Sequence, residues 1–223
     1  MRPAEARWIA ARLAALPRDR ISPLLNLGSS TGETREVRQP HIDALIFAPL
    51  RAAGVEIIHS DLKQAPGVDI AGDLLDPAVQ TQLRARRPRA ALSSNLLEHV
   101  RSPAVFARAM ASLVEPRGLV LVTVPRSYPY HADPIDTGFR PTPTELAALF
   151  PDCALVHGEV VADSTYGEEL WRQGRNGLRK GVRTLLGALR PHGDVARAQR
   201  DRLRWMLRPF TTTCIVLETA ARS

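Results

Sequence analysis

Cysteine is scarce in this chain of 223 residues, where Cys153 and Cys214 are the only two and lie far apart. Neither belongs to a CxxC pair and the histidines do not cluster, so nothing signals a disulfide framework or a structural zinc site. No apolar run reaches membrane-spanning length, and Glu5, Arg7 and Arg12 interrupt the N-terminal segment where a signal peptide would be continuous. These absences predict a cytoplasmic protein with two buried, reduced cysteines.

Lysine is nearly absent as well, because only Lys63 and Lys180 occur among 30 basic residues. The formal net charge is +7 and the isoelectric point is about 10.4. Residues 164–210 contain 11 basic and 4 acidic side chains, whereas the rest of the chain is formally neutral. A local contact with an anionic ligand or a membrane surface is therefore favoured over diffuse nucleic-acid binding, with a solvated arginine face as the alternative.

Short uncharged strands alternate with amphipathic helices along the chain, which is typical of an α/β protein with a mostly parallel sheet. We expect strands over 21–27, 55–59, 68–70, 90–94, 118–124, 154–161 and 211–219. We expect helices around Trp8 to Leu16 and over 41–53, 77–86, 102–113 and 142–150. The pattern predicts a Rossmann-like seven-stranded sheet with helices on both faces and a helical insertion before the last strand. One domain would span 1–163 and 211–223, and the insertion 164–210.

The loop after the first expected strand contains glycines but lacks the dinucleotide-binding pattern. Its sequence over residues 26–33 is Asn-Leu-Gly-Ser-Ser-Thr-Gly-Glu, in which Ser30 and Glu33 replace two of the required glycines. No Gly-Lys-Ser/Thr follows, so a nucleoside triphosphate P-loop is also excluded. What remains is a turn that lets the backbone approach a ligand without phosphates.

Polar residues follow the next three expected strands, where ligands of parallel sheets bind. Asp61 can accept hydrogen bonds from both hydroxyls of a ribose, and Asp73 can accept from an exocyclic amine such as that of adenine. Asn95 ends the fourth strand, in Asn-Leu-Leu-Glu-His-Val. We expect Glu98 and His99 of that segment to have structural roles.

In this order, the four motifs resemble those of the class I S-adenosylmethionine-dependent methyltransferases, over about residues 20–160 and the final strand. The resemblance implies S-adenosyl-L-methionine as cofactor, and no metal ligand is assigned. Asn26 stands where the family has an acidic residue, and Ser30 stands where it has its middle glycine. The implied cofactor-binding residues are Asn26, Gly28, Ser29, Ser30, Gly32, Asp61, Leu62, Asp73, Leu74 and Asn95.

A long loop over residues 125–140 follows the fifth expected strand and carries the candidates for catalysis. Methyl transfer to a hydroxyl requires a base beside the attacking oxygen, and His131, Asp133 and Asp136 are the candidates. We favour His131 as the base, a carboxylate as its orienter, and Arg140 as a ligand for a substrate anion. The alternatives are a turn with no role in binding and a divalent cation held by the three side chains.

The run from Pro129 to Leu146 is similar to bacterial methyltransferases of the methyltransferase type 11 kind, which are associated with sugar or surface-polysaccharide pathways. The resemblance implies O-methylation of a small molecule such as a sugar or glycoconjugate. One alternative is an RNA methyltransferase that uses the basic insertion, although no amino-methylating motif and no aromatic stacking platform is evident in a chain with 5% aromatics. The other is a non-catalytic binding or scaffold protein with this fold.

The insertion contains one strongly amphipathic segment. An apolar set shares one helical face, and an arginine stripe lies beside it. We expect this helix to lie over the cofactor domain as a lid, with its arginines directed at an anionic partner. The apolar set is Trp171, Leu178, Val182, Leu185 and Leu189, and the arginines are Arg172, Arg175, Arg179 and Arg183.

Overall fold

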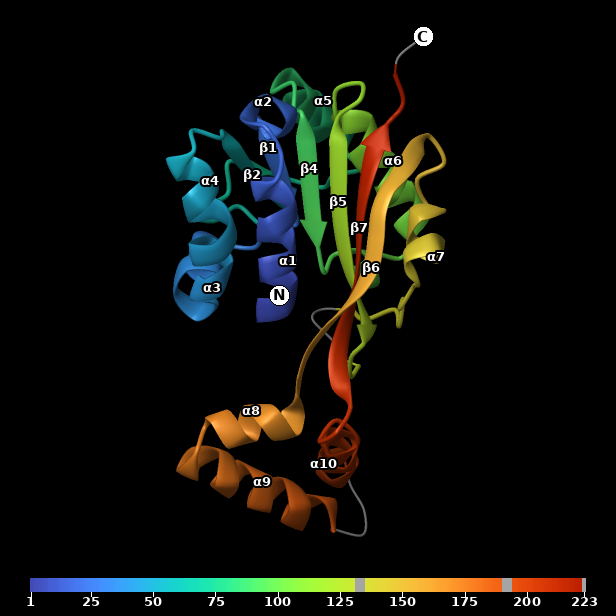
Figure 1. The fold of residues 1–223 in the computed structure, drawn as a ribbon. Helices are drawn as coiled ribbons and strands as arrows, with labels where there is room; N and C mark the ends of the chain where they lie inside the picture. The colour runs from blue at the N-terminus through green and yellow to red at the C-terminus, as the bar shows by residue number, and fades with distance from the viewer. Residues whose placement is uncertain (131–134, 190–193, 222–223) are drawn as a thin grey trace.

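The computed structural model describes residues 1–130, 135–189 and 194–221, and its centre is a seven-stranded sheet (Figure 1). The strand order is β3-β2-β1-β4-β5-β7-β6; β1 to β5 pair in parallel, β7 is antiparallel to β5, and β6 is antiparallel to β7. This confirms the predicted mostly parallel α/β sheet. The strands are β1 Leu24–Leu27, β2 Ile57–Asp61, β3 Ile70–Ala71, β4 Ala90–Ser94, β5 Leu119–Ser127, β6 Cys153–Thr165 and β7 Pro209–Thr219.

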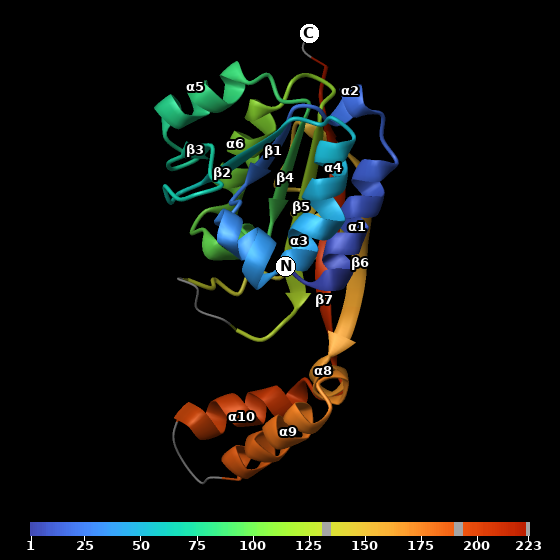
Figure 2. The same ribbon diagram turned by 90° about the vertical axis from the view of Figure 1, so that its left-hand side faces the viewer.

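Helices cover both faces of the sheet (Figures 1 and 2). On one face lie α1 Pro3–Ala14, α3 Pro40–Ile42, a π-helical turn η2 Asp43–Phe47, and α4 Ala48–Ala52. On the other lie α5 Pro77–Ala85, α6 Pro103–Leu113 and α7 Pro143–Ala147. Short turns α2 Arg18–Ile21, η1 Thr34–Arg38 and η3 Leu97–His99 complete the described part of this domain.

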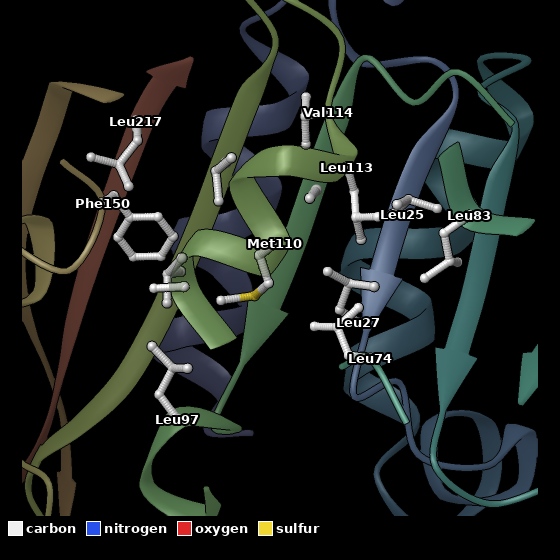
Figure 3. Packing of buried hydrophobic residues seen from close by; sticks show 14 of the residues in the cluster. Leu25, Leu27, Leu74, Leu83, Leu97, Met110, Leu113, Val114, Phe150 and Leu217 are labelled. Carbon is white, nitrogen blue, oxygen red and sulfur yellow. The ribbon is translucent and has the colours of Figure 1, made fainter. Parts of the chain in front are cut away.

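Side chains of neighbouring strand positions alternate between two apolar clusters, one on each face. Leu24 and Leu121 pack with Ile9 and Phe47 beneath α1 and η2. The alternate residues of the same strands, together with Met110 and Phe150, form the cluster on the opposite face that Figure 3 shows. This double burial explains why β1, β4 and residues 119–125 of β5 carry no charge.

Several predicted boundaries were wrong by a few residues. The first strand begins at Leu24 instead of residue 21, because 18–21 form a helical turn. The fifth strand was expected to stop before Pro125, but β5 continues to Ser127. Its pairing with β7 becomes irregular between Pro125 and Ser127, and a proline, which donates no backbone hydrogen bond, is tolerated at such an irregularity.

The described residues between β6 and β7 form three helices, α8 Tyr166–Arg172, α9 Arg175–Ala188 and α10 Asp194–Arg204, which we call the helical arm. The arm lies beyond the carboxyl ends of the parallel strands, and α9 is on its side away from the sheet (Figures 1 and 2). The apolar face of α9, expected to cover the cofactor domain, is instead exposed. The helix packs within the arm through its glycine face, where Gly177 meets α8 and Gly187 meets α10.

Candidate functional site

The loop after β1 turns sharply at Gly28, whose φ of +66° favours glycine. A Cβ atom there would lie 3.0 Å from Leu96 Cδ1, so a side chain would be crowded as well as strained. Asn26, Gly28, Ser29, Ser30 and Asn95 line one cavity of about 240 Å³ at the carboxyl ends of β1 and β4. The structure thus brings together five of the predicted cofactor residues.

Asn26 is buried at the base of this cavity, and its amide nitrogen lies 3.0 Å from Nδ1 of His59. Burial, and then the charge of Arg35, lower the pKa of His59 to about 4. The imidazole is therefore neutral near pH 7, and its Nδ1 accepts the hydrogen bond from Asn26. This arrangement directs the donor side of the amide to His59 and leaves the amide oxygen as an acceptor for a ligand.

Ser30 has a backbone φ of +55°, in the left-handed region that favours glycine. Its N–H donates to Asp61 Oδ2 at 2.7 Å, and its carbonyl accepts from Arg35 at 2.8 Å. These two contacts from separate elements hold the serine in a conformation that costs a non-glycine residue roughly 1 kcal/mol.

The buried Arg35 was not predicted from the sequence. Its guanidinium donates to the carbonyls of Ser29 at 2.9 Å, Ser30 at 2.8 Å and Gly67 at 2.6 Å. One side chain therefore joins the β1 loop to the segment before β3. No sequence signal distinguishes it, because an arginine just after a loop is usually solvated.

The remaining predicted cofactor residues lie outside this cavity, near the ends of β2 and β3. Asp61 Oδ1 accepts from the N–H of Lys63 at 3.1 Å, and Asp73 Oδ1 accepts from the N–H of Leu75 at 2.9 Å. Leu62 is exposed and Leu74 is buried. Gly32 donates its N–H to Pro66, which anchors the end of the β1 loop against the segment preceding β3.

Glu5 of α1, also missed from the sequence, links the ends of two strands. Its Oε1 accepts from Asn95 Nδ2 at 2.8 Å and from Thr123 Oγ1 at 2.6 Å, and its Oε2 accepts from the N–H of Arg2 at 3.1 Å. Asn95 itself has φ +51°. The side chain of Asn95 is thus oriented by a buried carboxylate from the first helix.

The loop after β5 is held by Glu98. Thr137 donates to the Glu98 carbonyl through its N–H at 2.9 Å and its hydroxyl at 3.0 Å. In the same loop, the carboxylate of Asp136 accepts hydrogen bonds from the Arg140 guanidinium at 2.6 and 3.1 Å. Burial raises the pKa of the Glu98 carboxyl to about 8. Asp136 is buried, so its charge is balanced by Arg140. His131 and Asp133 lie outside the described residues.

A second, larger cavity of about 720 Å³ lies where the end of β5 meets the helical arm. All three tyrosines, one tryptophan and one phenylalanine line it, although the whole chain has only 11 aromatic residues. No feature of the sequence indicated this aromatic cluster, because these residues are spread along the chain and only folding joins them. The lining residues are Tyr128, Pro129, Tyr130, Tyr166, Asp201, Arg202, Arg204, Trp205, Arg208 and Phe210.

Arginines already occupy ring faces in this second cavity. The guanidinium of Arg208 lies 5.1 Å from the ring centre of Trp205, and that of Arg2 lies 4.3 Å from the ring centre of Phe210. The Trp205 and Phe210 rings stack on each other at 5.3 Å. Guanidinium groups therefore cover one face of the Trp205 ring and one face of the Phe210 ring, so the cavity presents positive charge and not a row of open ring faces.

The described residues contain neither a membrane-spanning helix nor a cluster of metal ligands. No helix in 1–130, 135–189 or 194–221 is long and apolar enough to cross a membrane. Within the same ranges, no three His, Cys, Asp or Glu side chains are grouped as metal ligands would be.

Comparison with known proteins identifies the family. The profile described as "Methyltransferase domain" matches residues 2–193. A comparison with curated proteins returns no match. A proposed sarcosine dimethylglycine methyltransferase from Galdieria sulphuraria is similar in structure, with a TM-score of 0.56, 13% identity, and coverage of 98% of this chain and 85% of the other.

Two further solved structures share the fold. Coclaurine N-methyltransferase, bound to N-methylheliamine and SAH, has a TM-score of 0.54 and 11% identity, with 97% of this chain and 70% of the other covered. The 1,6-didemethyltoxoflavin-N1-methyltransferase of Burkholderia thailandensis has a TM-score of 0.50 and 15% identity, with 98% and 77% covered. At these identities the likeness concerns the fold alone. The profile match covers most of the chain, which therefore belongs to the methyltransferase domain family and is an S-adenosylmethionine-dependent methyltransferase.

Proposed function

We propose that this methyltransferase transfers a methyl group to a hydroxyl oxygen of a sugar or glycoconjugate that carries an anionic group. The observation that carries the proposal is the second cavity, which combines Arg202, Arg204 and Arg208 with three tyrosines. Guanidinium groups bind phosphate or carboxylate in two-pronged geometry. Tyrosine hydroxyls can both donate to and accept from sugar hydroxyls.

The first cavity fits the cofactor. Gly28 and Asn26 line this cavity, and the Asn26 amide oxygen supplies an acceptor for an ammonium group. Asp61 and Asp73 follow neighbouring strands, where they would meet the ribose and the adenine. S-adenosylmethionine would supply a methyl group on a positively charged sulfur, which leaves as a neutral thioether.

The reaction needs an acceptor oxygen in line with that methyl group and a base for its proton. His131, which lies outside the described residues, would accept the hydroxyl proton as the oxygen attacks the methyl carbon. Asp136 or Asp133 orients the imidazole or holds a second acceptor hydroxyl. Arg140 remains a candidate ligand for a substrate anion, and it would share its charge with Asp136.

The two alternatives to this proposal make different use of the same features. An RNA methyltransferase would use the cluster of aromatic and basic residues for bases and phosphates, but the arginines over Trp205 and Phe210 compete with base stacking. The chain would be a non-catalytic scaffold protein if Asn26 and Ser30 abolished its affinity for the cofactor. The contacts of these two residues with His59, Asp61 and Arg35 support retained binding.

Calorimetry with S-adenosylmethionine and S-adenosylhomocysteine tests the first step, and we expect both to bind. Absence of binding to either in a folded sample would overturn the proposal, whereas binding without turnover on any sugar acceptor would favour the scaffold. Turnover on RNA but on no phosphorylated or acidic sugar would favour the RNA alternative.

Variants test the assigned residues. His131→Ala and Asp136→Asn are expected to lower turnover at least tenfold and to leave cofactor affinity unchanged, with the exposed Asp152→Asn as the control. Arg202→Gln with Arg204→Gln should raise KM for the acceptor roughly tenfold with little effect on kcat, because these residues bind a group remote from the reacting oxygen. Unchanged turnover in both first variants would refute the catalytic assignment.

A further inference from the structure

The α9 helix presents its apolar face to solvent and its small residues to the rest of the arm. Trp171 of α8 is 88% exposed, Leu178 is 71% exposed and Leu189 is 73% exposed. Val182, Leu185 and Leu186 of α9 are also about half exposed or more. An exposed apolar surface of this extent in a folded domain usually marks a site of contact with another molecule.

The glycines of α9 explain why its apolar side chains face solvent. A Cβ atom at Gly177 would overlap the carbonyl oxygen of Leu170, and one at Gly187 would lie 2.8 Å from Gln199 Cγ. Close packing against α8 and α10 therefore uses the glycine side of α9 and excludes its leucine side. The leucines cannot turn inward without separating the three helices of the arm.

The exposed face also has an apolar groove of about 590 Å³ between α8 and α9. Trp171, Leu178, Val182 and Leu185 form its walls, while glycines leave space between the two helices. Such a groove can accommodate hydrocarbon or an apolar side chain without unfolding the arm.

Positive charge runs along one edge of the same face. Arg175, Arg179 and Arg183 follow one another at intervals of four residues, so they align along the helix beside the apolar side chains. All three are exposed, and none forms a hydrogen bond or ion pair within the described part of the chain. An apolar stripe bordered by unpaired arginines is the pattern of helices that lie in the interface of an anionic membrane.

A second copy of the arm would complement this face poorly. Of the acidic side chains described in the arm, Glu168 caps α8, Glu169 pairs with Arg2, and Asp201 pairs with Arg204. None remains to neutralise the arginine row, so two arms meeting through their leucines would bring like charges together.

We propose that the α8–α9 face docks the protein on the surface of an anionic lipid bilayer, with the exposed apolar residues in the interface and the arginines at the lipid phosphates. This goes beyond the methyl-transfer function and does not depend on it. Because α9 lies on the far side of the arm from the sheet, docking would leave the second cavity between the bilayer and the catalytic domain (Figure 2).

Sedimentation of the full chain with vesicles tests the proposal. We expect binding to vesicles of mixed phosphatidylglycerol and phosphatidylcholine, and much weaker binding to phosphatidylcholine alone. Replacing Arg175, Arg179 and Arg183 by glutamine should weaken binding to the anionic vesicles on the order of a hundredfold, at roughly fivefold for each charge. A matched control replaces the exposed Arg7, Arg86 and Arg108 by glutamine and should leave binding nearly unchanged.

A second variant tests the apolar part of the face. Leu178→Glu with Leu185→Glu should weaken vesicle binding at least tenfold, while Val105→Glu on the exposed side of α6 should not. Cofactor affinity and circular dichroism serve as folding controls for each variant. Equal binding to both vesicle types, or binding insensitive to the leucine variant, would overturn the proposal. So would a dimer in light scattering that the leucine variant dissociates, because the face would then be a contact between copies.

Discussion

The methyltransferase domain and the helical arm use amphipathic helices in opposite ways. In the domain, α1 turns Ile9, Leu13 and the carboxylate of Glu5 toward the sheet, and Arg7 outward. In the arm, α9 turns Gly177 and Gly187 inward and its leucines outward. The same periodicity therefore produces a buried stripe in one region and an exposed stripe in the other.

Amphipathic spacing shows that a helix has two different faces, but it does not show which face meets the protein. In α9 the position of glycine decides, because only the glycine face permits the close approach of α8 and α10. A helix with glycines on one face and leucines on the opposite face is thus a candidate for surface docking. A helix with leucines on one face and only charged residues on the opposite face is typical of a helix that packs on the core.

Truncating one leucine in each region gives the largest expected difference. Leu13→Ala should lower the free energy of unfolding by about 2–5 kcal/mol, because it removes fully buried atoms and leaves a cavity. Leu185→Ala should change it by less than about 0.5 kcal/mol, because this side chain is half exposed. Urea titration followed by circular dichroism measures both. A loss above 2 kcal/mol for Leu185→Ala would mean that the apolar face of α9 is covered in solution.

A buried carboxyl of the domain should make its stability depend on pH. The pKa of Glu98 rises from 4.5 to about 8 on folding, so the folded state holds a proton that the unfolded state releases. Stability should therefore fall as the pH rises from about 4.5 to about 8, by about 3 kcal/mol at pH 7. Glu98→Gln resembles the protonated form and should remove this decline, as seen in urea titrations at several pH values. An unchanged pH profile in Glu98→Gln would show that other groups cause it, and the exposed Asp152→Asn serves as the control.

The succession of strands and helices along the chain was predictable, and so was the grouping of five predicted residues around the first cavity, because strand ends repeat a local pattern. Gly28 directly follows β1, Asp61 ends β2 and Asn95 directly follows β4, and a parallel sheet aligns such ends on one edge. Arg35 and Glu5 were not predictable, because each acts through partners on other elements that only the folded chain brings near. The aromatic cavity was missed for the same reason.

Two glycines of α9 should respond in opposite directions to the same substitution. Gly177→Ala should destabilise the arm by about 1–3 kcal/mol, because the new methyl group would overlap the Leu170 carbonyl. Gly181→Ala should stabilise α9 by about 0.5–1 kcal/mol, because its methyl group would contact only Leu170 Cδ1 at 3.5 Å and alanine favours helix. Hydrogen exchange of the α9 amides measures both effects. Equal effects would contradict the assignment of the packed face.

The smallest expected difference comes from a capping motif that both regions share. Thr142 and Glu145 cap α7, and Thr165 and Glu168 cap α8, with the same reciprocal side-chain to backbone hydrogen bonds. Replacing either threonine by alanine should cost about 1 kcal/mol. For Thr142→Ala the loss should appear in global unfolding, because Leu146 anchors α7 in the core. For Thr165→Ala we expect hydrogen exchange of the α8 amides to detect the loss, and urea titration of the domain to show no change. If Thr165→Ala lowers global stability as much as Thr142→Ala, the arm unfolds together with the domain, and its exposed face is held rigidly by the sheet that carries the active site.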